Sequence, residues 1–248
     1  MTSPAAEGRV AFISGASRGI GAGIAACFAE RGMKLVLCSR TAPALASSDD
    51  VLADSLDVRD EAGLEVLVAE AEARWGAIDL WINNAGVLDP IASLRDVSLA
   101  AFKEHIDINL AGVFVGSKCY VNHLRRQKQQ GVLINVSSGA ATKARSGWGA
   151  YCAGKAAVER LTEVFAVEES EIGLRAYSVA PGVVDTDMQA LIRATPEEKF
   201  PDVPRFHQMK QEGAFNSEGF VADEFLKIAF DAAHLPVATA VRLASESR

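Results

Sequence analysis

The sequence has little cysteine, no long apolar run and no excess of basic residues. Its four cysteines form no Cys-x-x-Cys pair and lack metal-ligand spacing, so we expect free thiols in a reducing compartment and no metal site. No apolar stretch is long enough to span a bilayer, and the polar first residues lack the apolar core of a secretion signal. These absences predict a cytoplasmic protein without a membrane partner.

Acidic residues outnumber basic ones, 32 to 25, which gives a formal net charge of −7. An acidic surface repels the phosphates of nucleic acids, so we expect no nucleic-acid partner. The densest basic cluster, Arg125, Arg126 and Lys128, is typical of a solvated helix end. Hydrophobic residues make up 49% of the chain, which is enough for one sizeable core.

Short apolar runs alternate with helix-like segments along the chain. The runs are continuous, which is typical of strands buried on both faces of a parallel sheet. They cover residues 10–13, 35–38, 51–56, 78–82, 132–136, 174–179 and, less clearly, 237–243. The helical segments are 20–30, 61–75, a long one within 99–128, and 151–169. This order predicts an α/β fold: a single doubly wound, Rossmann-type parallel sheet of about seven strands with helices on both faces.

No Pro-, Gly- or Ser-rich linker divides the chain, so we expect one domain over residues 1–248. The connection 41–50 is too short and too rich in small residues for a full helix. Residues 194–217 break the alternation, since they combine prolines and charges with little periodicity. We expect this segment to be an insertion that covers a substrate at the carboxyl ends of the strands, where ligands bind in such sheets.

A glycine-rich turn, residues 14–21, follows the first expected strand and opens the first helix. Gly15, Gly19 and Gly21 permit a tight turn and a close approach of the backbone to a pyrophosphate. The helix N-terminus adds free N–H groups and a partial positive charge. Glycines also serve as ordinary turn residues, but this position between a strand and a helix predicts a dinucleotide site.

The residues after the second expected strand bear on which dinucleotide binds. An acidic residue there would bind the ribose 2′-hydroxyl of NAD, whereas an arginine accommodates the 2′-phosphate of NADP. No acid lies between Val36 and Ala46, while Arg40 is present and Arg18 lies in the adjacent turn. Because a guanidinium pairs well with a phosphate, we predict NADPH as the cofactor. The alternative is that Arg40 is an ordinary surface charge.

Tyr151 and Lys155 stand four residues apart and therefore share one helix face. A nearby ammonium stabilises a phenolate and lowers its pKa, which suits Tyr151 for proton exchange. Ser137 and Ser138 end the expected fifth strand, where a hydroxyl can polarise a substrate carbonyl. The alternative for these serines is a turn cap.

In their order and spacing, these motifs resemble the short-chain dehydrogenase/reductase family. The resemblance rests on SGASRGIG, NNAG, an asparagine at 109, serines at 137 and 138, YCAGK, and Pro181-Gly182 followed by Thr186. It implies that Tyr151 exchanges a proton with the substrate oxygen, that Ser138 orients this oxygen, and that Lys155 holds the nicotinamide ribose. Asn109 would relay protons through water to Lys155.

The resemblance also implies contacts with cofactor and substrate. With Arg40 included, the expected cofactor-binding residues are Gly15, Ser17, Arg18, Ile20, Arg40, Asp57, Val58, Asn84, Ala85, Gly86, Tyr151, Lys155, Pro181, Gly182, Val184 and Thr186. The residues expected at the substrate are Ser138, Trp148, Tyr151 and Val183, although Trp148 is equally compatible with packing or an interface. Phe206, His207 and Met209 could close over a hydrophobic substrate, but we assign no chemical role to His207.

Two stretches, YCAGKAA at 151–157 and APGVVDTDMQ at 180–189, resemble sepiapterin reductase and the benzil-type diketone reductases. Sepiapterin reductases anchor the pterin with an acidic residue near the C-terminus, whereas the tail here offers only Glu246. We therefore predict an NADPH-dependent reductase of a ketone, diketone or sepiapterin-like carbonyl, with Tyr151 as general acid. The alternatives are an alcohol dehydrogenase working oxidatively with NAD(P) and a non-catalytic NADP-binding regulator.

The helices expected within 102–128 and 151–169 correspond to those with which the family pairs subunits. The second carries more apolar residues than one buried stripe requires. We therefore expect a homodimer or homotetramer, with burial inside a monomer as the alternative.

Overall fold

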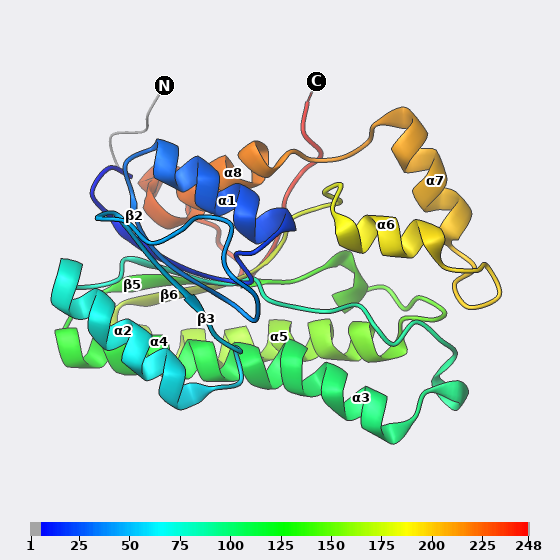
Figure 1. Ribbon diagram of the computed structural model, residues 1–248, viewed down its shortest axis with the longest axis horizontal. Coiled ribbons are helices and arrows are strands. Elements are labelled where there is room, and N and C mark those ends of the chain that lie inside the picture. The colour runs from blue at the N-terminus through cyan, green and yellow to red at the C-terminus, as the bar shows by residue number, and fades with distance from the viewer. Residues whose placement is uncertain (1–5, 248) are drawn as a thin grey trace.

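The computed structural model describes residues 6–247. Its parallel strands form one sheet in the order β3-β2-β1-β4-β5-β6-β7 (Figure 1). The strands are β1 (Val10–Ser14), β2 (Lys34–Ser39), β3 (Val51–Ser55), β4 (Leu80–Asn83), β5 (Gly131–Val136), β6 (Leu174–Ala180) and β7 (Ala240–Arg242). The strand order reverses between β1 and β4, which makes this the point where a ligand crevice opens. The prediction of a doubly wound parallel sheet of about seven strands is confirmed.

Helices cover both faces of the sheet (Figure 1). One face carries α1 (Gly19–Glu30) and α8 (Glu218–Phe230), and the other carries α2 (Glu61–Trp75), α4 (Gly112–Gln127) and α5 (Gly149–Glu168). Two clusters of buried side chains divide in the same way, one on each face, and a third joins Trp148 and Tyr151 to the 194–217 segment. The central strands are therefore buried on both sides, which explains their continuous apolar sequences.

The long helix expected within 99–128 is continuous but changes its winding. It consists of α3 (Leu99–Ile106), a π-helical turn η2 (Asp107–Ala111) and α4. The π turn contains Asn109, which is fully buried. Such turns insert an extra residue into the helix and often occur at functional sites.

Residues 194–217 are more regular than expected, because they contain helix α7 (Val203–Glu212). Pro204 lies in its first turn, where the missing N–H costs nothing, and Gly213 ends it with a positive φ of 61°. The preceding helix α6 (Asp187–Ala194) lies beside it at the right-hand end of Figure 1. The connection 41–50 has no helix, as expected.

Two buried asparagines join the central strands to the helices. Trp81 Nε1 donates to Asn83 Oδ1 at 2.9 Å, and Asn83 Nδ2 donates to Asn135 Oδ1 at 2.8 Å and to Ser117 Oγ at 3.1 Å. Asn135 Nδ2 in turn donates to Thr162 Oγ1 at 2.8 Å. The chain of hydrogen bonds thus runs from β4 and β5 to α4 and α5, beneath the carboxyl ends of the strands.

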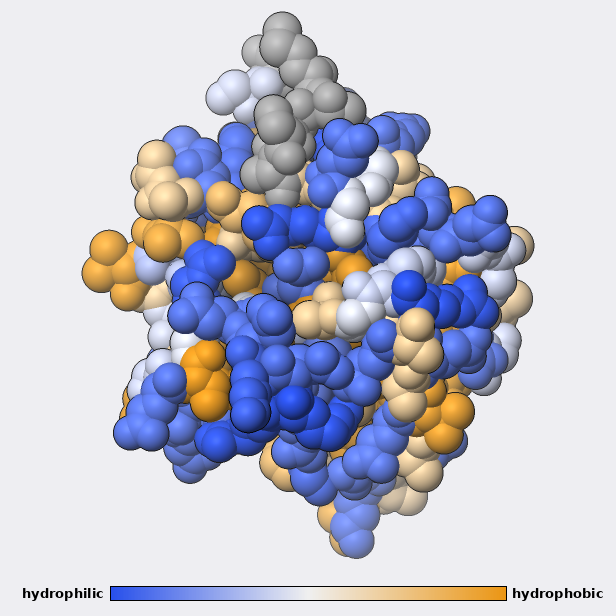
Figure 2. All heavy atoms as spheres, turned by 90° about the vertical axis from the view of Figure 1, so that its left-hand side faces the viewer, coloured by the Kyte–Doolittle hydropathy of each residue, from blue (hydrophilic) through white to orange (hydrophobic). Residues whose placement is uncertain are grey.

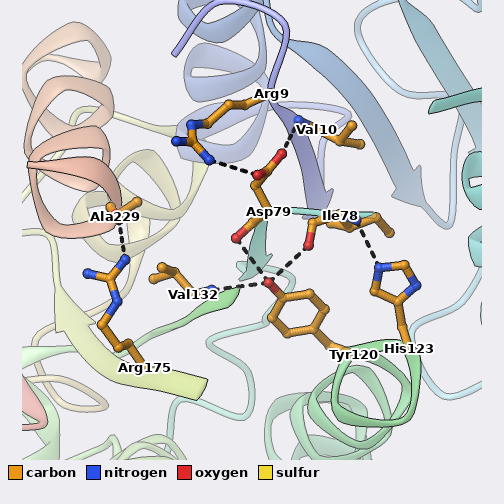
Figure 3. Close-up of polar contacts among 9 residues, drawn as sticks. All are labelled: Arg9, Val10, Ile78, Asp79, Tyr120, His123, Val132, Arg175 and Ala229. Carbon is orange, nitrogen blue, oxygen red and sulfur yellow. Dashed lines mark hydrogen bonds and ion pairs between the residues drawn. The ribbon is translucent and has the colours of Figure 1, made fainter. Parts of the chain in front are cut away.

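A second polar network ties the amino ends of the strands (Figure 3). The carboxylate of Asp79 accepts from Arg9 Nη1 at 2.8 Å and from the Val10 amide at 2.9 Å. The Tyr120 hydroxyl accepts from the Val132 amide at 3.1 Å and donates to the Asp79 carbonyl at 3.0 Å. These contacts join β1, β4 and β5 at the edge opposite the ligand crevice.

Figure 2 looks onto the left-hand end of the view in Figure 1, and this face is mainly hydrophilic, with apolar residues in small groups. Scattered apolar residues of this kind are normal on a protein surface. Among the described residues, no helix has the length and apolar character needed to cross a membrane.

We expect Tyr120→Phe to lower the free energy of unfolding by about 0.5–1.5 kcal/mol, because the buried hydroxyl no longer bonds the Val132 amide and the Asp79 carbonyl, while the Val132 amide keeps the Asp79 carbonyl as an acceptor. Tyr177→Phe is the matched control, since the Tyr177 hydroxyl makes no hydrogen bond with the described residues. Urea unfolding of both variants measures the difference. Equal midpoints would show that the Tyr120 hydroxyl contributes nothing.

Candidate active site

The glycine-rich turn lies at the point where the strand order reverses. Gly15 has a φ of 69° and Gly19 one of 55°, values that favour glycine. A Cβ on Gly21 would lie 2.4 Å from the Gly15 carbonyl oxygen, so only glycine lets the helix start so close to the turn. The residues present therefore fit a backbone cradle for a dinucleotide phosphate.

The end of β4 supports this turn. Asn84 Nδ2 donates to the Ser14 and Gly15 carbonyls, at 3.0 and 3.3 Å, and the Ser14 hydroxyl accepts the Asn84 amide at 3.0 Å. A Cβ on Gly15 would lie 2.8 Å from Ala85 Cα. The predicted residues Gly15, Asn84 and Ala85 are thus in contact, and Ser14 is a supporting residue that the sequence analysis missed.

The two arginines expected near the phosphates differ in their partners. Arg18 forms an exposed ion pair with Asp187 at 3.3 Å, at the start of α6. Arg40 follows β2, is exposed, and makes no ion pair with residues 6–247. Its charge contributes to lowering the pKa of Asp57, although the main cause there is the hydrogen bond from Arg59. Arg40 is therefore free to pair with an anion.

Asp57 and Val58, which are expected to contact the cofactor, are partly engaged by other residues of the chain. Arg59 binds the Asp57 carboxylate with two side-chain hydrogen bonds, of 2.9 and 2.8 Å. Val58 is buried, and a Cβ on Gly112 would lie 2.7 Å from its Cγ2. Val58 thus packs against the first turn of α4.

The two serines after β5 have different partners. The Ser137 hydroxyl is buried and donates to Glu159 Oε1 at 3.0 Å. The Ser138 hydroxyl accepts the Ala140 amide at 3.2 Å and also interacts with Tyr151, whose pKa it lowers. Ser138 therefore caps a turn, and its action on a substrate carbonyl stays a prediction.

Tyr151 and Lys155 lie buried on one face of α5, with Lys155 Nζ 5.7 Å from the centre of the phenol ring. Lys155 donates to the Val136 carbonyl at 2.6 Å, and burial lowers its pKa to about 8. Burial also raises the pKa of Tyr151, and Ser138 is the neighbour that lowers it. The pKa of Tyr151 is thus raised overall rather than lowered, because desolvation is the largest effect, and the stabilisation of the phenolate by Lys155 stays a prediction.

Asn109 is held by the peptide group of Val87. Its Oδ1 accepts the Val87 amide at 2.8 Å, and its Nδ2 donates to the Val87 carbonyl at 2.7 Å. A Cβ on Gly86 would lie 2.9 Å from Asn109 Oδ1. The π turn of the long helix is thereby fastened to the segment after β4.

The loop after β6 carries the other predicted cofactor residues. Thr186 packs against the glycine turn, since a Cβ on Gly19 would lie 3.2 Å from its Cγ2. Asn216, which the sequence analysis missed, donates to the Pro181 carbonyl at 2.9 Å and accepts the Glu246 amide at 2.8 Å. The backbone amide of Asn216 also donates to the Val183 carbonyl at 2.8 Å. No sequence signal indicates this residue, because its partners are backbone groups far along the chain.

Trp148 is mainly a packing residue, although it touches Tyr151. It is 5% exposed, and its ring stacks on Phe200 with centroids 4.5 Å apart. It also meets the Tyr151 ring edge-on at 5.6 Å and lies 5.7 Å from the Phe206 ring. His207 is exposed on α7. The 194–217 segment is therefore joined to α5 by an aromatic cluster.

A serine, tyrosine and lysine beside a dinucleotide turn form the arrangement of an oxidoreductase that acts on carbonyl or alcohol groups with NAD(P). The chain belongs to the short-chain dehydrogenase family. The family model, described as short chain dehydrogenase, matches residues 9–197.

Named relatives and solved structures agree with this assignment. The chain is 34% identical to "Benzil reductase ((S)-benzoin forming)" of Bacillus cereus, over 86% of this chain and 91% of that protein. It is 31% identical to the Bacillus subtilis (strain 168) protein of the same name, over 87% and 91%. The crystal structure of the KRED1-Pglu enzyme matches with a TM-score of 0.84 and 31% identity, over 95% of this chain and 100% of that one.

We expect Gly21→Ala to weaken NADPH binding by about tenfold, because relief of the 2.4 Å contact with the Gly15 carbonyl costs about 1–3 kcal/mol and moves the turn. Gly219→Ala is the control, since its Cβ would have its nearest neighbour at 3.8 Å. Fluorescence titration of the folded variants measures both affinities. Unchanged binding by Gly21→Ala would contradict the phosphate cradle.

Proposed function

We propose that this protein is an NADPH-dependent reductase of ketones, with 1,2-diketones as the substrate class. The observation that carries the proposal is that Ser138, after β5, and the buried Tyr151 and Lys155, on α5, lie at the carboxyl edge of the sheet, where Lys155 Nζ donates to the Val136 carbonyl at 2.6 Å. Burial raises the pKa of the phenol, so Tyr151 holds its proton at neutral pH. A protonated phenol is the form that a general acid for carbonyl reduction requires.

In this reaction Ser138 donates a hydrogen bond to the substrate oxygen and holds it beside Tyr151. Tyr151 then transfers its phenolic proton to that oxygen as negative charge develops there. The reduced nicotinamide, when bound, supplies the hydride for the carbonyl carbon. Gly15, Ile20 and Thr186 line the turn and loop proposed to hold the cofactor.

Lys155 supports the proton transfer. Its ammonium has three donors, and the Val136 carbonyl takes one of them. The remaining donors are available for the ribose hydroxyls of the cofactor and for a water on the path to Asn109. A cationic Lys155 favours the phenolate that Tyr151 leaves behind.

Arg40 supports NADPH rather than NADH. It lies after β2, it has no ion-pair partner among the described residues, and no acidic residue stands between Val36 and Ala46 in the sequence. A 2′-phosphate would find a bidentate donor there, whereas the nearby Asp57 carboxylate, which could accept from a ribose diol, is already bound by Arg59.

The C-terminal tail favours a diketone over a pterin. Glu246, its candidate anchor, accepts from the Ser217 amide at 2.6 Å and from the Ser217 hydroxyl at 3.0 Å. The carboxylate thus caps the N-terminus of α8 and is not free to bind a pterin. The two benzil reductases, which align over most of their length, support the diketone class.

We also propose that the protein acts in the cytoplasm as a homo-oligomer through α4 and α5. Phe114, Val164 and Val167 on these helices are 44%, 42% and 76% exposed. Phe114 also contacts Phe165 of α5, with ring centroids 6.4 Å apart. A second copy would bury this apolar surface.

The decisive assay follows the loss of reduced nicotinamide absorbance with benzil, small diketones, sepiapterin, quinones and simple aldehydes. We expect turnover of diketones, and we expect Tyr151→Phe to lower kcat by about 100-fold or more while NADPH binding is unchanged. A variant that keeps most of its kcat would remove Tyr151 from the mechanism. If the wild-type enzyme turned over none of these carbonyls, the diketone assignment would be overturned.

We expect Arg40→Ala to weaken NADPH binding by about tenfold and to leave NADH binding unchanged, since only NADPH loses a charge-assisted hydrogen bond. Arg74→Ala is the control, because Arg74 pairs with Glu70 on the outer surface of α2. Titrations of both variants with both cofactors provide the comparison. Equal losses for NADPH and NADH at Arg40 would refute the 2′-phosphate contact.

A further inference from the structure

His105 is a buried histidine to which the sequence analysis assigned no role. It lies in the last turn of α3, is 1% exposed, and precedes Asn109 by four residues. Its ring meets the Tyr151 ring edge-on, with centroids 6.0 Å apart and planes at 81°. The ring thus lies between the π turn and the catalytic helix.

The hydrogen bonds of Asn109 fix the orientation of its amide. Its oxygen accepts the Val87 amide, and its nitrogen donates one hydrogen to the Val87 carbonyl. A flipped amide would lose both contacts. The second hydrogen on Nδ2 is therefore available only to His105 Nε2, which lies 2.7 Å away.

The partners of His105 fix its protonation state in the same way. Nδ1 lies 2.6 Å from the Asp89 carbonyl, which can only accept, so Nδ1 carries a hydrogen. Nε2 faces the N–H of Asn109 and must offer its lone pair. His105 is therefore a neutral Nδ1–H imidazole that connects the segment after β4 with the π turn.

We propose that His105 is a positioning residue, which as the neutral Nδ1–H tautomer holds Asn109 in the orientation that the proton path to Lys155 needs. The expected effect of His105 on the rate of carbonyl reduction rests on the proposed function. The hydrogen bonds between His105 and Asn109 are independent of that function.

The surroundings of His105 keep it neutral. The titratable groups that face it are Lys155 and Tyr151 from α5 and Asp89 from the segment after β4. Burial is the main cause that lowers the pKa of His105, and the Lys155 charge lowers it further. Protonation would put a hydrogen on Nε2 against the Asn109 N–H, and two donors cannot share a hydrogen bond.

Three substitutions separate the contacts of this ring. The oxygen of glutamine in His105→Gln can replace Nε2 as the acceptor for Asn109, and it does not titrate. His105→Asn can keep a donor for the Asp89 carbonyl but cannot reach Asn109. His105→Phe keeps a ring against Tyr151 and loses both hydrogen bonds.

We expect His105→Phe and His105→Asn to lower kcat by about tenfold, with unchanged KM for NADPH, because Asn109 loses its buried acceptor. His105→Gln should keep kcat within about threefold of wild type, since it preserves this hydrogen bond. The wild-type kcat should fall as the pH falls through the lowered pKa of His105, and this loss should be absent in His105→Gln. Equal kcat values for His105→Phe and wild type would overturn the proposal, as would failure of His105→Gln to restore kcat above the His105→Phe value.

A readout without turnover distinguishes this proposal from the proposed function. ¹⁵N NMR of the wild-type protein should show His105 as the Nδ1–H tautomer at neutral pH, and the Asn109 side-chain signals should shift in His105→Phe but not in His105→Gln. A protonated or Nε2–H His105, or unshifted Asn109 signals in His105→Phe, would overturn the proposal. If the wild-type enzyme reduces none of the carbonyls, the proposed function fails, while these spectra still decide whether His105 holds Asn109.

Discussion

The hydrogen bond between the amides of Asn83 and Asn135 is the constraint on which the site depends. The two residues are direct neighbours on β4 and β5, and both side chains are buried. An amide in an apolar interior is costly unless its hydrogen bonds are made, and here Trp81, Ser117 and Thr162 supply the remaining partners. Only one register of strands and helices satisfies all of them.

This register also sets the positions of the residues of the candidate site that follow Asn83 and Asn135. Asn84, which supports the glycine turn, is the next residue after Asn83, and Ser138 follows Asn135 by three residues. Thr162 holds α5 against β5, so Tyr151 and Lys155 approach the same edge. The contacts of Asp79 and Tyr120 restrain the amino ends of the strands. The candidate site lies at the opposite, carboxyl ends.

The fold could be predicted closely because buried parallel strands leave continuous apolar runs, and Glu61–Trp75 has the helix bounds expected. The residues proposed for the chemistry lie in local motifs, so the sequence could bring them forward as candidates. His105 and Asn216 were not, because their partners are carbonyls of Asp89 and Pro181, and carbonyls leave no sequence signal. Helix α7 was missed because the prolines of the 194–217 segment and the helix's own charged residues obscure its two buried residues, Val203 and Phe206. For His105, the spacing of four residues from Asn109 was the one sequence feature that indicated a contact, because residues four apart share a helix face.

The groups proposed for the chemistry and the segment proposed to cover the substrate belong to different parts of the fold. Ser138, Tyr151 and Lys155 lie after β5 and on α5, whereas Phe200 and Phe206 belong to the 194–217 segment and pack on Trp148, whose ring also meets that of Tyr151. A change in that segment can reshape the apolar wall without displacing the catalytic groups. Asn216, at the end of the same segment, fastens the Pro181 loop to the tail, so this loop is held independently of the aromatic residues of the segment. A fold that holds its parts independently in this way can carry different sites on one framework.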